Sequence, residues 1–174
     1  MLTLLVVQDT KYSTLPDVVM YTHKHKDHYD EDFIRKYTEI TGKMAYGPQD
    51  INFVSAGNIL IDIIPTRHIG KSDISHVSYI IKGSKCVWFM GDASPVIIKN
   101  MSELPNPDVL IVPYAYAVTE SSWRMVKGIN PKKIILLHLP HTQYDEYNLW
   151  DKVFDVTKND ELLLIPEIGE KIIF

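Results

Sequence analysis

Three histidines and one aspartate lie within six residues, at His23, His25, Asp27 and His28, at the end of the apolar run 18–21. A neutral imidazole ring is a frequent ligand of zinc, iron and related metals, and an aspartate supplies a hard oxygen ligand. Four such groups on one short loop can converge on one metal centre or on two neighbouring centres. A solvated polar loop rarely has three histidines at this spacing after a strand-like run. We therefore interpret the segment as a metal-binding loop.

Three more candidate ligands follow apolar runs that are typical of buried strands. They are His68 after residues 59–66, Asp92 after residues 87–90, and His138 after residues 134–137. In layered folds of strands and helices, sites assemble on loops at one edge of the sheet, where several strands end. Each residue alone has an ordinary explanation as a loop, turn or buried polar residue. Together they favour one shared site with the loop that holds His23.

Two of these ligands have a rival nearby in the sequence. His76 can replace His68, but it opens the strand-like run 75–79, whereas His68 follows such a run. His141 can replace His138, but it lies beyond a proline and further from the strand end. We favour His68 and His138 as ligands and expect His141 at the rim of a pocket.

The rest of the chain shows alternating strand and helix patterns. Strands are predicted at residues 2–7, 18–22, 52–55, 58–66, 76–82, 85–90, 108–113, 133–137, 162–165 and 171–174. Helices are predicted at residues 31–41, 95–100, 119–127 and 144–156. The last two strands are expected to form a hairpin across Gly169. This mixture predicts an α/β (α+β) domain with both helical and sheet layers.

The first and last long helices carry the clearest helical patterns. Asp30 is a suitable N-cap for the first helix, and Gly42 is a suitable stop. Apolar residues at helical spacing are expected to face the core. They are Phe33, Ile34, Tyr37 and Ile40 in the first helix, and Leu149, Val153 and Phe154 in the last.

The composition is that of one compact globular domain spanning residues 1–174, with 45% hydrophobic and 23% charged residues. The single cysteine, Cys86, excludes an intramolecular disulfide and a CxxC zinc site, and we expect it to be a small buried hydrophobe. The net charge of −4 argues against a general nucleic-acid binder. No apolar run reaches membrane-spanning length, and the apolar start lacks the basic segment of a signal peptide. A cytoplasmic location is the simplest expectation.

The candidate ligands together resemble a known set of motifs. The run from His23 to His28 resembles the HxHxDH signature of the metallo-β-lactamase superfamily. His68, Gly91-Asp92 and His138 resemble its third, fourth and fifth motifs, in the same order. The resemblance covers nearly the whole chain and implies a four-layer αββα sandwich with a binuclear metal site at one edge. Within the superfamily, segments 107–113 and 130–133 resemble the branch of ascorbate-6-phosphate-lactonase-like hydrolases.

The resemblance also implies a role for each ligand. His23, His25 and His68 would hold a first metal ion, and Asp27, His28 and His138 a second, with Asp92 bridging both. Asp27 would in addition orient the bridging water. The implied cofactors are two divalent ions, most simply zinc, although iron and manganese suit the same ligands. Two such ions roughly 3.5–4 Å apart lower the pKa of a shared water towards about 7. The resulting bridging hydroxide would attack an acyl or phosphoryl centre.

The chain also departs from this family in two places. Relatives have additional strands before residues 2–7, so either the first sheet is shortened or a partner chain covers its edge. Where lactonase-like relatives have a glycine pair after Pro113, this chain has Tyr114-Ala115-Tyr116. The retained Asp92 is unlike true β-lactamases, which disfavours antibiotic hydrolysis.

The leading prediction is a metal-dependent hydrolase of a small-molecule ester, lactone or phosphodiester. The alternatives are a phosphodiesterase or nuclease, a non-catalytic metal-stabilised module, for which a homo-oligomer is one arrangement, and an iron-dependent redox role, which the absence of a flavin motif disfavours. Substrate contacts are expected from Arg67, Tyr114 and His141. Further candidates near the pocket are Lys24, Lys26, Lys71, His76 and Tyr116.

Overall fold

The computed structural model describes residues 15–26, 29–50, 53–70, 73–101, 103, 105–158, 160–167, 170 and 172–173. The strand predicted at residues 2–7 lies outside this set, as do Asp27 and His28 of the predicted metal-binding loop. Lys71 and Gly169 also lie outside it.

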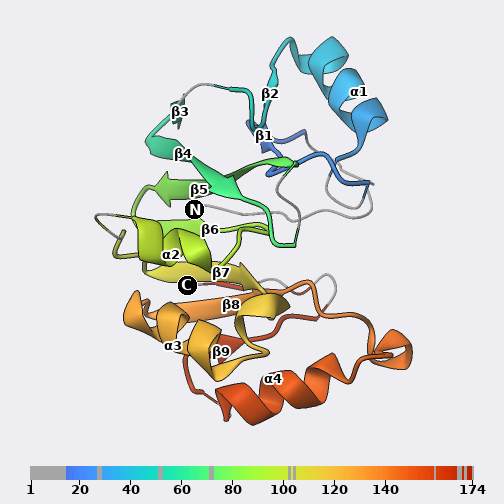
Figure 1. Cartoon of the computed structure of the whole chain (residues 1–174). Helices are drawn as coiled ribbons and strands as arrows, with labels where there is room; N and C mark the ends of the chain where they lie inside the picture. The colour runs from blue at the N-terminus through green and yellow to red at the C-terminus, as the bar shows by residue number, and fades with distance from the viewer. Residues whose placement is uncertain are drawn as a thin grey trace.

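The described strands form a seven-stranded sheet in the order β3-β4-β5-β6-β7-β8-β9 and a two-stranded sheet, β1-β2 (Figure 1). The strands of the large sheet are β3 (Phe53–Ala56), β4 (Ile59–Arg67), β5 (Ser75–Lys82), β6 (Cys86–Phe89), β7 (Val109–Pro113), β8 (Lys133–Leu137) and β9 (Leu163–Leu164). Those of the small sheet are β1 (Val19–Met20) and β2 (Ala45–Tyr46). In the large sheet, β3 to β6 pair antiparallel and β6 to β9 pair parallel. The bounds of β1 and of the seven strands of the large sheet lie within two residues of the predicted ones, whereas β2 was not predicted.

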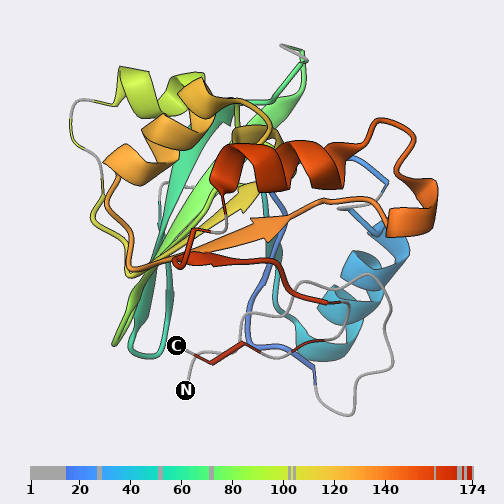
Figure 2. The ribbon, with the colours of Figure 1, turned by 90° about the horizontal axis from the view of Figure 1, so that it is seen from below.

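Helices cover the two sheets on their outer sides (Figure 2). One face of the large sheet packs against α2 (Val96–Asn100), α3 (Glu120–Gly128) and α4 (Leu149–Thr157). The opposite face packs against the small sheet, and α1 (Glu31–Thr41) lies beyond that sheet. Two short 3₁₀ turns, η1 (Tyr114–Tyr116) and η2 (Thr142–Tyr144), follow β7 and β8. The predicted four-layer αββα fold is confirmed by the described residues, whereas the predicted shortening of the N-terminal sheet depends on residues outside this set and stays a prediction.

Strand β5 shows why the large sheet is buried on both faces. Successive side chains of a strand point to opposite faces of the sheet. Ile80 belongs to the core cluster on the side of α2, α3 and α4. Its neighbours Tyr79 and Ile81 belong to the cluster that receives Val18 and Met20 from the small sheet. The strand therefore contributes to two apolar cores.

The same strand attaches the small sheet to the large one. The buried Tyr79 hydroxyl lies 2.7 Å from the carbonyl oxygen of Tyr21 and 3.2 Å from that of Tyr46. The backbone N–H of Val77 donates to the carbonyl of Thr22, at 3.0 Å. Because these bonds hold the chain at Tyr21 and Thr22, they fix the position of the histidine that follows.

Local capping explains why α1 was predicted correctly. The Asp30 side chain accepts a hydrogen bond from the backbone N–H of Phe33, at 2.9 Å. Gly42 ends the helix in the left-handed conformation, with φ of 69°. Tyr37 is buried as predicted, but Ile40 is 69% exposed, so its assignment to the core is wrong.

The prediction was less accurate at the C-terminal end. Helix α4 begins five residues later than predicted, with Asn148 as its N-cap. The carboxylate of Asp145 accepts hydrogen bonds from the backbone N–H groups of Leu149 and Trp150 in the first turn and so stabilises the helix start there. Val153 is fully buried, but Phe154 is 47% exposed, which contradicts its predicted inward position. Strand β9 pairs in parallel with β8, and the described residues 172–173 form no strand, so the prediction of a terminal hairpin was wrong for this part of the chain.

In the described residues, no helix is long and apolar enough to cross a membrane.

Cys86 gives a first testable prediction. It is partly buried against the helix-covered core, and this burial raises the pKa of its thiol. Because the thiolate is the reactive form, iodoacetamide at neutral pH should modify the native protein more slowly than the urea-unfolded protein. Mass spectrometry of quenched samples measures both rates. Equal rates would contradict the protection inferred from the fold.

Candidate metal centre

Five of the predicted ligands lie together at one edge of the molecule. They are His23 and His25 after β1, His68 after β4, Asp92 after β6 and His138 after β8. One ligand atom from each of His23, His25, His68 and Asp92 lies within 4.8 Å of the others. The expectation that separate strand ends deliver their polar residues to one place is met by this geometry.

The carboxylate of Asp92 lies between the histidines. Its Oδ2 atom is 3.6 Å from Nε2 of His23 and 3.7 Å from Nε2 of His68. Its Oδ1 atom is 3.6 Å from Nε2 of His138. These separations are longer than hydrogen bonds. The two oxygens of one carboxylate therefore face different sets of imidazoles.

The hydrogen bonds of His68 determine which of its nitrogens can bind a metal ion. Its Nδ1 atom lies 2.6 Å from the carbonyl oxygen of Ile69, which can only accept, so Nδ1 carries the proton. Its Nε2 atom is left with a lone pair, is buried, and has no hydrogen-bond partner among the described residues. A buried lone pair without a partner costs free energy, and a second bond from the far nitrogen is typical of metal-binding histidines. The chemistry of this site fits a metal ion.

His23 is the most deeply buried of the cluster, with no exposed surface. Its Nδ1 atom is 2.9 Å from Oγ1 of Thr22, and its Nε2 atom is 3.0 Å from Nδ1 of His25. Thr22, which sequence reasoning did not single out, therefore holds the ring of His23 from behind. The only feature of the sequence that pointed to this role of Thr22 was its hydroxyl directly before the first histidine.

Gly91 was named with Asp92 as part of a motif, but its structural role was not predicted from the sequence. It adopts a φ of 53°, in the left-handed region, and a Cβ atom there would lie 2.6 to 2.8 Å from the side chain of Thr22. No residue with a side chain fits at this position without displacing Thr22. The glycine before Asp92 thus lets the two loops approach.

The structure gives His76 and His68 different roles. His68 lies in the cluster, whereas Nε2 of the buried His76 accepts a hydrogen bond from the backbone N–H of Asp92, at 3.0 Å. Asp27 and His28 lie outside the described residues, so their roles as ligands stay predictions. Among the residues that the structure describes, His138 alone represents the predicted second group of ligands.

The predicted substrate contacts are less closely associated with the cluster. Among the described residues, no hydrogen bond or ion pair joins the side chain of Arg67, Tyr114 or His141 to it. Arg67 and His141 are exposed and Tyr114 is partly buried. The ammonium group of Lys24 lies 5.0 Å from the centroid of the Tyr29 ring. The exposed Lys26 ends the described part of the metal-binding loop.

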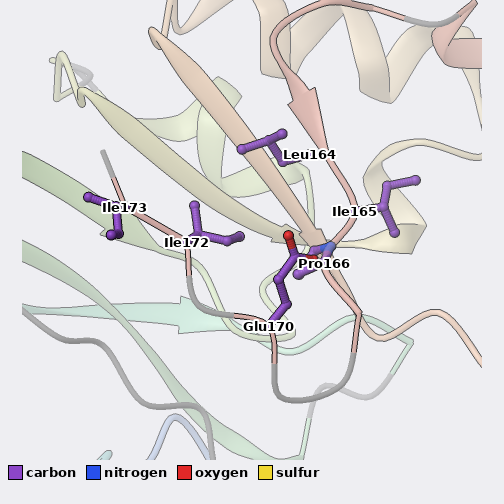
Figure 3. Close-up of a pocket in the computed structure, with 6 residues that line it drawn as sticks. All are labelled: Leu164, Ile165, Pro166, Glu170, Ile172 and Ile173. Carbon is purple, nitrogen blue, oxygen red and sulfur yellow. The ribbon is translucent and has the colours of Figure 1, made fainter.

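Two surface depressions lie beside the large sheet. One, of about 330 Å³, is lined by Pro65, Thr66, Arg67, Val96, Ile97 and Asn100. The other, of about 250 Å³, lies beside β9 and is lined by Leu164, Ile165, Pro166, Glu170, Ile172 and Ile173 (Figure 3). Neither of these two includes a residue of the histidine cluster. The depression of about 330 Å³ extends to Arg67, the residue directly before His68.

Tyr116 lies after β7, the strand between those that lead to Asp92 and His138. Burial raises the pKa of its hydroxyl, and the charge of Asp92 raises it further. The hydroxyl is buried without a hydrogen-bond partner among the described residues. A buried hydroxyl without a partner costs roughly 1–3 kcal/mol.

Tyr116→Phe should therefore raise the free energy of unfolding by about 1 kcal/mol, measured by urea denaturation. Tyr79→Phe is the matched control, because it removes a hydroxyl that lies against two carbonyl oxygens and should lower stability instead. Loss of stability in Tyr116→Phe would show that this hydroxyl has a partner in solution.

Comparison with known proteins identifies the family. A family model described as a β-lactamase superfamily domain matches residues 6–138. The chain therefore belongs to the metallo-β-lactamase superfamily, as the order of its ligand motifs indicated.

Individual relatives are more distant. The chain is 24% identical over 164 residues to a UPF0173 metal-dependent hydrolase of Methanoregula boonei (strain DSM 21154 / JCM 14090 / 6A8), covering 80% of this chain and 70% of the relative. Its fold is similar to that of Igni18, a metallo hydrolase from Ignicoccus hospitalis KIN4/I, with a TM-score of 0.60, 19% identity, and 90% and 78% of the two chains covered. It is also similar to the metallo-β-lactamase fold protein YhfI from Bacillus subtilis, with a TM-score of 0.54, 21% identity, and 88% and 76% coverage.

Proposed function

We propose that this protein is a binuclear metal-dependent hydrolase that cleaves an ester, lactone or phosphodiester bond in a small molecule. The observation that carries the proposal is the position of Asp92, with one carboxylate oxygen facing His23 and His68 and the other facing His138. A carboxylate in this position can contribute one oxygen to each of two ions. Membership of the superfamily and the name of the Methanoregula relative support the same activity.

The ligands divide into two groups. His23, His25 and His68 would hold the first ion, since their nitrogens and a carboxylate oxygen converge. His138 would hold the second ion, together with Asp27 and His28. When bound, two divalent ions lower the pKa of a shared water to about 7 and polarise the substrate oxygen.

The chain's own groups favour the tautomer and the orientation that these ligands need. The carbonyl of Ile69 keeps the proton of His68 on Nδ1, so that Nε2 faces the centre. The hydroxyl of Thr22 holds the ring of His23 from the opposite side. These outer hydrogen bonds orient both rings towards the proposed centre. Asp27 would position the attacking water. With water as the nucleophile, the proposed reaction needs no cysteine nucleophile.

Three residues near the centre are proposed to contact the substrate. Arg67 precedes His68 directly and can meet a phosphate or carboxylate group through its guanidinium. Tyr114 follows β7, and His141 follows the loop of His138, so both border the same edge. The proposed substrate is a small molecule.

The test is elemental analysis of the purified protein after reconstitution with zinc, iron(II) or manganese(II), compared with His68→Ala. We expect about two ions per chain in the wild type and a loss in the variant. His141→Ala is the matched control for metal content, because its ring lies outside the cluster. Absence of metal after reconstitution with all three ions would refute the proposal.

Activity is tested on the metal-loaded protein with nitrophenyl esters, a panel of lactones and bis-nitrophenyl phosphate. Hydrolysis that disappears on chelation and returns with the metal supports the proposed function, and the responding substrate identifies the bond class. A protein that binds metal but hydrolyses none of these compounds would favour the non-catalytic, metal-stabilised module.

A further inference from the structure

A short row of buried polar side chains crosses a core face that is otherwise apolar. His76 and Ser78 alternate with apolar residues along β5, on the same side as Ile80, and both are buried. Thr66 of β4 lies directly opposite His76 in the antiparallel register. Burying polar groups in such a position costs free energy unless they bond to one another. These three residues do so.

The hydrogen bonds define one chain of contacts that ends at Asp92. The backbone N–H of Asp92 donates to Nε2 of His76, at 3.0 Å. Since Nε2 accepts, the proton of the neutral ring lies on Nδ1, which is 2.5 Å from Oγ1 of Thr66. The hydroxyl of Ser78 lies 3.5 Å from the same Oγ1 atom and 3.3 Å from the carbonyl oxygen of Met90.

The backbone around Asp92 is held from another side as well. The carbonyl oxygen of Asp92 accepts from the N–H of Ile69, at 2.8 Å. The next residue, Ala93, forms an isolated antiparallel bridge with His68. The Asp92 loop is thus fixed to the loop of His68 by its carbonyl and to β5 by its N–H.

We propose that His76 is a positioning residue that, with Thr66, fixes the backbone of Asp92 so that its carboxylate lies between the two groups of metal-binding histidines. This inference rests on the proposed metal-dependent function. His76 acts through the peptide group of Asp92 and is not itself a ligand. Thr66 sets the tautomer of His76. Its hydroxyl oxygen can accept a hydrogen bond from Nδ1–H of the ring, which leaves Nε2 to accept from Asp92.

A purely structural role makes a different prediction. If His76 only filled space in the core, its replacement would change the stability of the metal-free protein without changing the metal affinity of the folded molecules. A positioning role predicts a loss of metal affinity that an acceptor at the same place restores. Groups that support metal ligands in this way typically contribute 10- to 100-fold in metal affinity.

The experiment compares His76→Leu, His76→Gln and His76→Asn with the wild type. Leu fills the space without an acceptor, the amide oxygen of Gln reaches the position of Nε2, and that of Asn reaches only the position of Nδ1. Zinc affinity is measured by competition with a chromophoric chelator, and the visible spectrum of the cobalt(II)-substituted proteins reports the geometry around the ion. Thermal unfolding of the metal-free proteins gives the folded fraction.

We expect His76→Leu and His76→Asn to bind zinc about 10- to 100-fold more weakly and His76→Gln to recover most of the affinity. Thr66→Val should also weaken binding, since it removes the partner of Nδ1. If His76→Leu does not fold, the difference between Gln and Asn decides the question. Unchanged zinc affinity in His76→Leu, or equal affinities of the Gln and Asn variants, would overturn the inference while leaving the proposed function intact. A wild-type protein that binds no metal would instead refute both.

Discussion

Asp92→Ala is expected to abolish hydrolysis and to weaken metal binding at both positions. Its two carboxylate oxygens face His23 and His68 on one side and His138 on the other. Removal of this carboxylate therefore affects both proposed metal positions, whereas removal of one histidine affects only one of them. Loss of an interaction worth several kcal/mol in the transition state corresponds to about a thousand-fold lower rate, or more.

The measurement combines elemental analysis with hydrolysis of whichever test substrate the wild type cleaves. Asp155→Ala is the matched control, because it removes an exposed carboxylate from α4 and should keep full metal content and activity. Circular dichroism of the metal-free proteins confirms that both variants fold. An Asp92→Ala protein that retained two ions and full activity would refute the bridging role.

Local signals in the sequence were sufficient for the elements whose ends depend on neighbouring residues. Helix α1 has the predicted bounds, because Asp30 caps its start and Gly42 ends it. The exposed Ile40 and Phe154 show the limit of the same reasoning. Periodicity identifies the side of a helix that faces the core, but it does not show how far the covering layer extends.

The centre could be predicted as a cluster of candidate ligands, because a strand end is recognisable from the apolar run before it. His68 and Asp92 were placed correctly at one edge by this rule alone. The role of His76 could not be found in the same way. It depends on the pairing of His76 with Thr66 across two strands, and one residue of register shift would turn the ring to the other face.

The second large effect is expected from Gly91→Ala, which changes no ligand. Gly91 has a φ of 53°, where a residue with a Cβ atom is strained by roughly 1–2 kcal/mol. The new Cβ would also lie within 2.8 Å of three side-chain atoms of Thr22, and forced overpacking costs about 1–3 kcal/mol more. Because Thr22 holds the ring of His23, we expect the clash to displace that ligand and to lower zinc affinity as well as stability.

Gly57→Ala separates the two contributions. Gly57 has a similar φ of 60°, but a Cβ there meets no atom within 4 Å, and it lies in the turn between β3 and β4. It should therefore show only the conformational strain, a loss of about 1–2 kcal/mol in urea denaturation, with unchanged zinc affinity. Gly91→Ala should lose about twice as much stability and bind zinc more weakly in its folded fraction. Equal effects of the two substitutions would mean that Thr22 moves aside freely, and that the close approach of these loops does not position His23.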